Sequence, residues 1–287
     1  MAKVIERSFE ATGHTSIMCD FSPPRSGDAA VVDQAQLDVD FISVSYNPGR
    51  AVRTDSAMLA AAVQRSGRDA LFTLATRDMN KLALQSQLLG AQMLGLNNVI
   101  VVQGDPFSEQ DRTRVASVAD YSTTGLIAAI SQMNQGKDFR DGNLRTATDL
   151  CVGAAVDLGR GIEEEAQLAV RKVRAGAEFL ITQPVFDVDQ VARYRESYAY
   201  HAGKAGTLPI YFGLQILEQD GVLFSSVPDS VRNELEGGRP GIDMALELYQ
   251  RFQDARLNNI YLMPPIKRGG ARDYAAAKEL LAKINRL

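Results

Sequence analysis

The chain has 287 residues, carries a formal net charge of -4 and is 45% hydrophobic. This length and apolar content suffice for two ordinary domains or for one large α/β barrel. Acidic and basic residues are interleaved without a basic stripe, so the sequence predicts no nucleic-acid partner. Because the chain has neither a signal-peptide core nor a run of about 18 apolar residues, we expect a cytoplasmic protein with no membrane partner.

Eight apolar runs rich in valine, isoleucine, leucine and phenylalanine predict strands. They cover residues 16–21, 41–46, 70–76, 98–104, 150–156, 179–186, 209–217 and 259–265. None of them alternates strictly between polar and apolar residues, which is typical of parallel strands that are covered on both faces.

Segments with helical periodicity separate most of these strands. They cover residues 55–67, 79–95, 122–136, 162–177, 188–203, 241–256 and 273–287, and several of them end at a glycine. Repeated βα units of about 30 residues favour a single-domain (β/α)8 TIM barrel over residues 1–287 rather than an open doubly wound sheet. The stretch ELEGGRPG at 234–241 predicts a loop before a helix.

The two cysteines and two histidines bear on metal and nucleophilic sites. Cys19 and Cys151 lie within predicted strands, which predicts buried thiols rather than a disulfide or a metal pair. His14 precedes the first strand, and His201 lies in a predicted helix or the loop after it. We therefore expect neither a metal site nor Ser-His-Asp or Cys-His catalysis.

Polar residues gather where the predicted strands end, which is where a barrel of this class carries its chemistry. They are Asp20, Ser45, Asn47, Thr73, Thr76, Gln103, Asp105, Thr182, Gln183 and Gln215. Asp20 and Asp105 supply two carboxyl groups, and a partly buried carboxylic acid can donate a proton near neutral pH. The alternatives are a turn cap for Asp20 and an ordinary Gly-Asp-Pro turn for Asp105.

Two prolines follow the first strand in the segment CDFSPPR at 19–25. Pro23 lacks a backbone donor and restricts Ser22 to extended geometry, so the strand stops and the direction of Asp20 is fixed. Arg25 can pair with a carboxylate or be solvated, and solvation is the more common outcome for such a residue.

Phosphate-binding loops are not indicated, because neither GxGxxG after a strand nor GxxxxGK[ST] occurs in the sequence. Arg171 and Lys172, on the helix before the sixth strand, can meet a phosphate or form a solvated helix face.

Several motifs together resemble those of methylenetetrahydrofolate reductases. In chain order they are CDFSPPR, FISVSYNPGR, RDMNKLALQSQLLGAQMLGLNNVIVVQGDP, YSTTGLIAAISQMNQGKD, KVRAGAEFLITQPVFD and NIYLMPP. They extend from about residue 15 to 266, and the likeness is strongest to the reductase half of fused homocysteine methyltransferase/reductase proteins. The resemblance implies a (β/α)8 barrel with FAD at its mouth, reduced by NADH or NADPH and reoxidised by 5,10-methylenetetrahydrofolate to give 5-methyltetrahydrofolate.

The resemblance also implies roles for individual residues. Asp20 stands where the family has the acid that protonates the folate nitrogen and opens the five-membered ring, and Asp105 matches the acid near the flavin and pterin. Gln183, Phe224 and Gln215 are expected to bind the folate. The expected cofactor-binding residues are Ser45, Thr73, Leu74, Gln103, Gly104, Asp105, Tyr121, Ala154, Arg171 and Lys172.

The sequence departs from the family pattern at three places. Residues 73–76 read TLAT where the family has H-[LI]-T-C, and residues 154–161 read AAVDLGRG instead of the usual flavin-binding stretch. Asp20 replaces a glutamate, which shortens the reach of the acid by one methylene group. Two of these three changes lie in the expected flavin site.

Two alternative functions stay open at the level of the sequence. One is a pterin reductase that takes its hydride directly from a nicotinamide or from an electron-delivering partner protein. The other is a tetrahydrofolate-linked methyl transferase or binding subunit without redox activity. The expected partners are a small folate molecule and either a second copy of the chain or an electron-delivering or methyltransferase protein.

Overall fold

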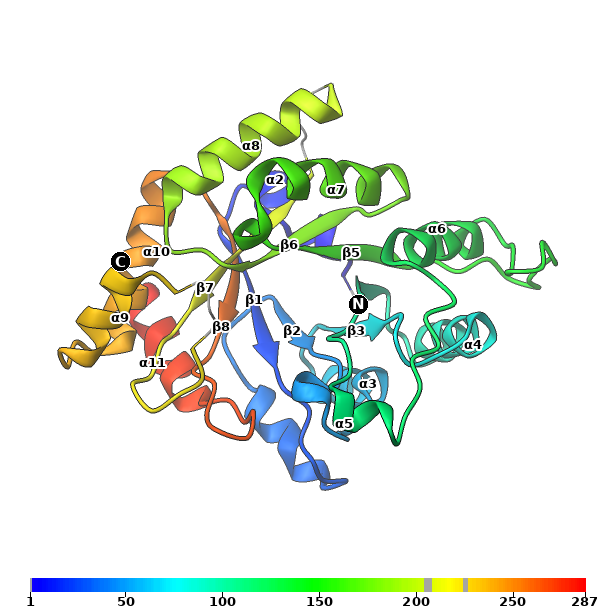
Figure 1. Ribbon diagram of the computed structural model, residues 1–287, viewed down its shortest axis with the longest axis horizontal. Helices are drawn as coiled ribbons and strands as arrows, with labels where there is room; N and C mark the ends of the chain where they lie inside the picture. The colour runs from blue at the N-terminus through cyan, green and yellow to red at the C-terminus, as the bar shows by residue number, and fades with distance from the viewer. Residues whose placement is uncertain (1, 204–207, 224–226) are drawn as a thin grey trace.

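Eight parallel strands form one closed barrel in this computed structural model, which describes residues 2–203, 208–223 and 227–287. The strands are β1 (Ser16–Phe21), β2 (Phe41–Val44), β3 (Ala70–Ala75), β4 (Asn98–Val102), β5 (Cys151–Val156), β6 (Phe179–Pro184), β7 (Ile210–Gln215) and β8 (Asn259–Met263). They pair in chain order, and β8 closes the barrel against β1 (Figure 1). The predicted (β/α)8 barrel is confirmed.

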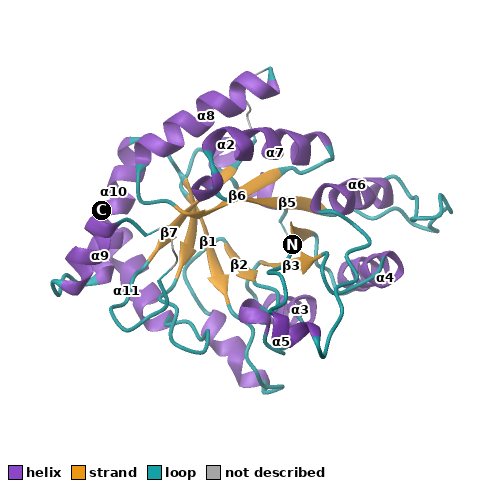
Figure 2. Cartoon of the chain, in the orientation of Figure 1, coloured by secondary structure: helices purple, strands orange, loops and turns teal. Residues whose placement is uncertain are grey.

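Helices surround the strands on the outside of the barrel (Figure 2). Seven of them match the predicted helical segments: α3 (Ser56–Arg65), α4 (Lys81–Met93), α6 (Thr123–Asn134), α7 (Ile162–Arg174), α8 (Val188–Ala202), α10 (Gly241–Asp254) and α11 (Tyr274–Ile284). Shorter elements were not predicted: α1 (Val4–Arg7), α2 (Phe9–Thr12), α5 (Glu109–Arg112), α9 (Asp229–Glu236), η1 (Ala29–Ala35), η2 (Pro48–Arg50) and η3 (Leu158–Arg160).

The predicted loop at 234–241 is wrong in part, because α9 continues to Glu236. This helix buries only Leu235, so its sequence offers too few apolar positions to show a helical repeat. Several predicted strands also extended too far. The fourth ends at Val102 rather than at 104, because Gly104 has a φ of +84°, outside the extended region.

Strand alternation divides the core into two layers. One cluster, which includes Met18, Leu71 and Tyr211, fills the interior of the barrel, and a larger cluster lies between the strands and the helices. Gly153 leaves room for a ring in the interior, since a Cβ there would lie 2.2 Å from Cζ of Phe179.

The predictions for the two cysteines are confirmed, because Cys19 and Cys151 are both free and buried. Burial, followed by the nearby charge of Glu178, raises the pKa of Cys151 to about 12. Neither thiol therefore ionises near neutral pH.

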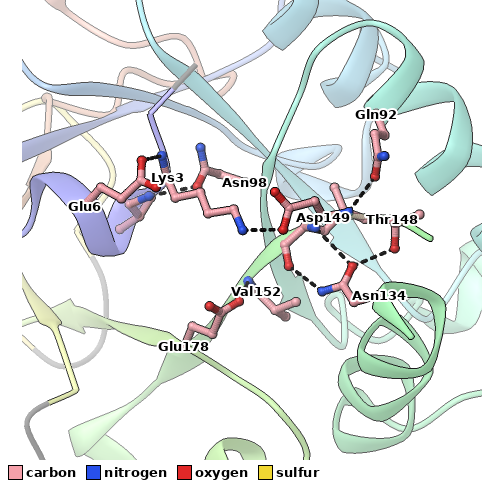
Figure 3. A network of polar contacts seen from close by, with 11 residues as sticks. Lys3, Glu6, Gln92, Asn98, Asn134, Thr148, Asp149, Val152 and Glu178 are labelled. Atoms are coloured by element: carbon pink, nitrogen blue, oxygen red, sulfur yellow. Dashed lines mark hydrogen bonds and ion pairs between the residues drawn. The ribbon is translucent and has the colours of Figure 1, made fainter. Parts of the chain in front are cut away.

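The N-terminal end of the barrel is closed by α1. Val4 is completely buried among the interior side chains, and its backbone N–H donates to Oδ1 of Asn98 on β4 over 2.8 Å. Figure 3 shows Lys3 reaching from the same segment to Asp149 just before β5. This closure leaves the C-terminal ends of the strands as the end at which a ligand can enter.

Candidate active site

Three predicted polar residues share the interior face at the C-terminal end of the barrel. Met18, Leu71 and Tyr211 belong to the interior cluster, and side chains two positions apart point to the same face of a strand. Asp20, Thr73 and Gln215 therefore point inward, and all three are buried. Gln183 is exposed and lies on β6 where its register with β7 shifts.

Asp20 lies in a buried polar cluster at the end of β1. Its side chain is 7% exposed; Oδ1 accepts a hydrogen bond from the Tyr261 hydroxyl at 3.2 Å, and Oδ2 accepts one from Nε of Arg272 at 2.7 Å. Burial raises the pKa of Tyr261 well above its ordinary value, so the phenol keeps its proton and donates it in this contact.

Arg272 comes from the segment between β8 and α11, and its side chain is only 9% exposed. Burial alone would lower the pKa of Arg272, but the charge and hydrogen bond of Asp20 leave it raised. The pair is therefore a buried salt bridge. Sequence reasoning missed Arg272, because residues 266–272 lie between the NIYLMPP motif and the last predicted helix and carry no motif or periodic pattern of their own.

A second arginine joins the loops beside this pair. Arg53 donates from Nη1 to the carbonyl of Pro23 at 2.8 Å, from Nε to that of Pro48 at 3.3 Å and from Nη2 to that of Gly269 at 3.1 Å. The backbone N–H of Ser22 donates to the Tyr274 hydroxyl at 2.9 Å. The segment with the two prolines is thus tied to the loops that follow β2 and β8.

A further ion pair lies at the ends of β3 and β4. Arg77 is buried and donates to Asp78 from Nε at 2.6 Å and from Nη2 at 2.8 Å, while its Nη1 donates to the backbone carbonyl of Asp105 at 2.6 Å. Burial first, and Asp78 second, raise the pKa of Tyr46 to about 12. The residue pair Arg-Asp directly after a predicted strand was a signal in the sequence for this cluster.

The predicted cofactor-binding residues do not all reach the mouth. Leu74 and Ala154 are completely buried in the outer cluster, so their side chains face the helices. Arg171 is exposed in the last turn of α7. Lys172 is buried beside it and donates to the carbonyl of Ala155 at 2.6 Å.

Other predicted residues lie near the C-terminal ends of β2, β3 and β4. The Ser45 hydroxyl donates to the carbonyl of Phe21 at 3.2 Å, whereas Gln103 and the Asp105 side chain are exposed. A Cβ at Gly104 would lie 3.3 Å from that of Ala75. The Tyr121 hydroxyl accepts a hydrogen bond from Gln85, with Lys81 above the ring. The remaining predicted residue, Phe224, lies outside the described residues.

The residues present do not fit a flavin diphosphate in the way the resemblance implies. A diphosphate needs cations or N–H groups that converge on it. Arg171 and the amine of Lys172 do not converge, since the first is exposed and the second is bound to a carbonyl. Burial also lowers the pKa of Lys172.

A small pocket of about 80 Å³ lies where β7 meets α9 and α10. Phe186, Gln215, Leu217 and Arg239 contribute to its walls. Oε1 of Gln215 is buried and has no hydrogen-bond partner among the described residues. An unpaired buried acceptor is costly, which makes this oxygen suited to a donor group on a ligand.

Within residues 2–203, 208–223 and 227–287, metal clusters and membrane-spanning helices are both absent. No group of three or more His, Cys, Asp and Glu side chains in those ranges could hold a metal ion. In the same part of the chain, no helix has the length and apolarity needed to cross a membrane.

The fold and the mouth define a (β/α)8 barrel protein with a buried carboxyl group at the C-terminal end of its first strand. The chain belongs to the methylenetetrahydrofolate reductase family, whose model matches residues 5–239. The fold is similar to that of a solved structure, an uncharacterized protein from Clostridium thermocellum that binds two copies of 5-methyl-5,6,7,8-tetrahydrofolic acid. The TM-score is 0.66 and the sequence identity is 13%, and the match covers 97% of this chain and 98% of that chain. The family match confirms the resemblance seen in the sequence.

Proposed function

We propose that the protein reduces 5,10-methylenetetrahydrofolate to 5-methyltetrahydrofolate, with NADH or NADPH as the source of the hydride. The observation that carries this proposal is the buried carboxyl group of Asp20 at the mouth of a barrel of this family. The tetrahydrofolate bound by the Clostridium thermocellum protein supports a folate ligand.

The reaction needs one proton and one hydride. Protonation of folate N10 breaks its bond to the methylene carbon and leaves an iminium ion at N5. The hydride adds to that carbon with its electron pair, N10 keeps the proton, and the nicotinamide is oxidised. Asp20 is the proposed general acid for N10, a role that typically contributes about 10²- to 10⁴-fold in rate.

The folate is proposed to lie with its pterin towards β6 and β7. The buried oxygen of Gln215 and the exposed amide of Gln183 can accept and donate hydrogen bonds to the pterin edge. Asp105 is proposed to lie near the same ring from the opposite side of the mouth. A buried polar atom that has no protein partner, such as Oε1 of Gln215, gives strong selectivity for a ligand that pairs with it.

The hydride can reach the folate through FAD, as the resemblance implies, or directly from the nicotinamide. The arrangement of Arg171 and Lys172 favours the direct route, because these cations do not converge on a phosphate site. Thr73 stands where the family has an aromatic contact to the flavin, which favours the same route. We therefore assign no step of the reaction to a flavin.

The test is a spectrum of the purified protein followed by turnover with NADH or NADPH. Nucleotide oxidation that depends on 5,10-methylenetetrahydrofolate and yields 5-methyltetrahydrofolate supports the proposal. A yellow protein that NADH bleaches indicates the flavin route, and a colourless active protein indicates the direct route. Folate binding without nucleotide oxidation under any donor would instead indicate a methyl transferase or binding subunit.

A further inference from the structure

We propose that Arg272 is a latch that holds Asp20 as a carboxylate in the free protein and leaves it when folate enters the mouth. This inference deepens the proposed function and rests on it, because it adds a positioning residue for the acid. The salt bridge would have to open before Asp20 could carry the proton that the reaction needs.

Both carboxylate oxygens of Asp20 are occupied in the structure. Oδ2 accepts from Nε of Arg272 at 2.7 Å and Oδ1 accepts from the hydroxyl of Tyr261 at 3.2 Å. The side chains of Asp20 and Arg272 are 7% and 9% exposed, so each shields the other from solvent. Each oxygen keeps a second lone pair, but a carboxylate that is paired with a guanidinium has no proton to give to a ligand until the pair opens.

Arg272 supplies the positive charge that faces Asp20 within the described residues. The other titratable groups around this carboxylate are Cys19 on β1, Tyr261 on β8 and Tyr274 on α11. Burial raises the pKa of each of these three groups, so all of them are neutral near pH 7. Arg272 is therefore the charged partner of Asp20 among these groups.

The segment that carries Arg272 is an exposed turn with the guanidinium at its end. Gly269 and Gly270 both have positive φ values, of 90° and 86°, and residues 267–269 are exposed. The contacts of their carbonyls are hydrogen bonds from Arg53 to Gly269 and from Ser22 and Arg272 to Gly270. The backbone of the segment is itself held, with Lys267 donating to Ala271 and Asp273 donating to Pro265. The proposed withdrawal is therefore a rotation of the Arg272 side chain, which breaks its bonds to Asp20 and to the carbonyl of Gly270.

Withdrawal of Arg272 changes the chemistry of Asp20. A buried carboxylate that loses its counter-charge is strongly disfavoured, and such a group takes up a proton instead. Entry of the folate would therefore create the acid at the moment when its substrate is present. Binding should consume a proton from solvent.

Calorimetric titration with 5-methyltetrahydrofolate at pH 7, in two buffers with different ionisation enthalpies, measures that proton. We expect the wild-type protein to take up about one proton per folate bound, and Asp20→Asn to take up almost none. Arg272→Met, which needs no salt bridge to be broken, should bind the folate about tenfold more tightly and take up less than the wild type. Arg272→Lys should restore proton uptake.

Arg268→Met is the matched control, because Arg268 is exposed in the same segment. It should behave like the wild type. Folate binding without proton uptake by the wild-type protein, or an Arg272→Met variant that binds no more tightly, would overturn the latch and leave the proposed folate site standing. Absence of binding in every variant would overturn the proposed function and the latch together.

Discussion

Nε of Arg272 lies 2.7 Å from Oδ2 of Asp20, although 252 positions separate the two residues in the chain. Barrel closure brings them together, because β8 pairs with β1 and Leu262 lies opposite Cys19 in that register. The proposed acid and its counter-charge therefore depend on the last strand and on the segment that follows it.

Gln215 gives a test of the pterin position. Gln215→Leu removes a buried oxygen that has no partner among the described residues, so we expect no loss of the free energy of unfolding. Folate affinity should instead fall by about tenfold, because the variant no longer offers the ligand a hydrogen-bond acceptor at this position. Calorimetry and urea unfolding measure the two effects, and an unchanged affinity would remove Gln215 from the site. Gln183→Ala should likewise weaken folate binding.

Substitution of Gly153 in the barrel interior and of Gly90 on α4 should change the free energy of unfolding in opposite directions. In Gly153→Ala the new Cβ would lie 2.2 Å from Phe179, which should lower the free energy of unfolding by about 1–3 kcal/mol. Gly90 lies within α4 with open space around it, so Gly90→Ala should raise the free energy of unfolding by about 0.5–1 kcal/mol. Urea unfolding measures both, and equal effects would contradict the interior packing.

Asp78 predicts a dependence of stability on acid. Burial would raise the pKa of Asp78, but hydrogen bonds from Arg77 and Tyr46 leave it below the ordinary value of 3.8. A lowered pKa stabilises the folded state above 3.8, and that contribution is lost as the pH falls through the folded value. The free energy of unfolding should therefore fall less steeply in acid for Asp78→Asn than for the wild type.

Arg77→Met is the matched variant for Asp78→Asn, because it removes the other partner of the same ion pair. It should likewise reduce the slope of the free energy of unfolding against pH in acid. A variant curve that stays parallel to the wild type below pH 3.8 would show that this pair does not set the dependence.

The two contacts that hold α1 against the N-terminal end of the barrel should contribute unequally to the free energy of unfolding. Asn98→Ala removes the acceptor of the buried Val4 N–H and should lower the free energy of unfolding by about 1–3 kcal/mol. Lys3→Met removes an ion pair whose Asp149 side chain is 75% exposed, and should cost about 1 kcal/mol or less. Thermal unfolding measures both, and a larger loss in Lys3→Met would contradict this account.

The barrel could be predicted because its strands and its main helices are long enough to show a pattern. Each of the eight apolar runs contains an observed strand, and the seven longer helices match their predicted segments. The short elements escaped because α1 and α5 have four residues each, and α9 buries only Leu235. A single helical turn has no repeat for a sequence pattern to reveal.

The site could be predicted only in part. Asp20 and Gln215 were found because each ends an apolar strand, whereas Arg272 lies in a segment whose position depends on barrel closure. Leu74 and Ala154 came from the resemblance alone. Leu71 and Cys151 face the interior of the barrel. Because side chains alternate along a strand, Leu74 and Ala154, three positions further on, face the helices.

The most direct test of Asp20 as the proton donor is the rate of 5-methyltetrahydrofolate formation at saturating 5,10-methylenetetrahydrofolate and NADH or NADPH. We predict that Asp20→Asn slows this rate by about 10²- to 10⁴-fold and that Asp20→Glu, which keeps a carboxyl group, recovers part of it. An Asp20→Asn protein that forms product at the wild-type rate would contradict the account.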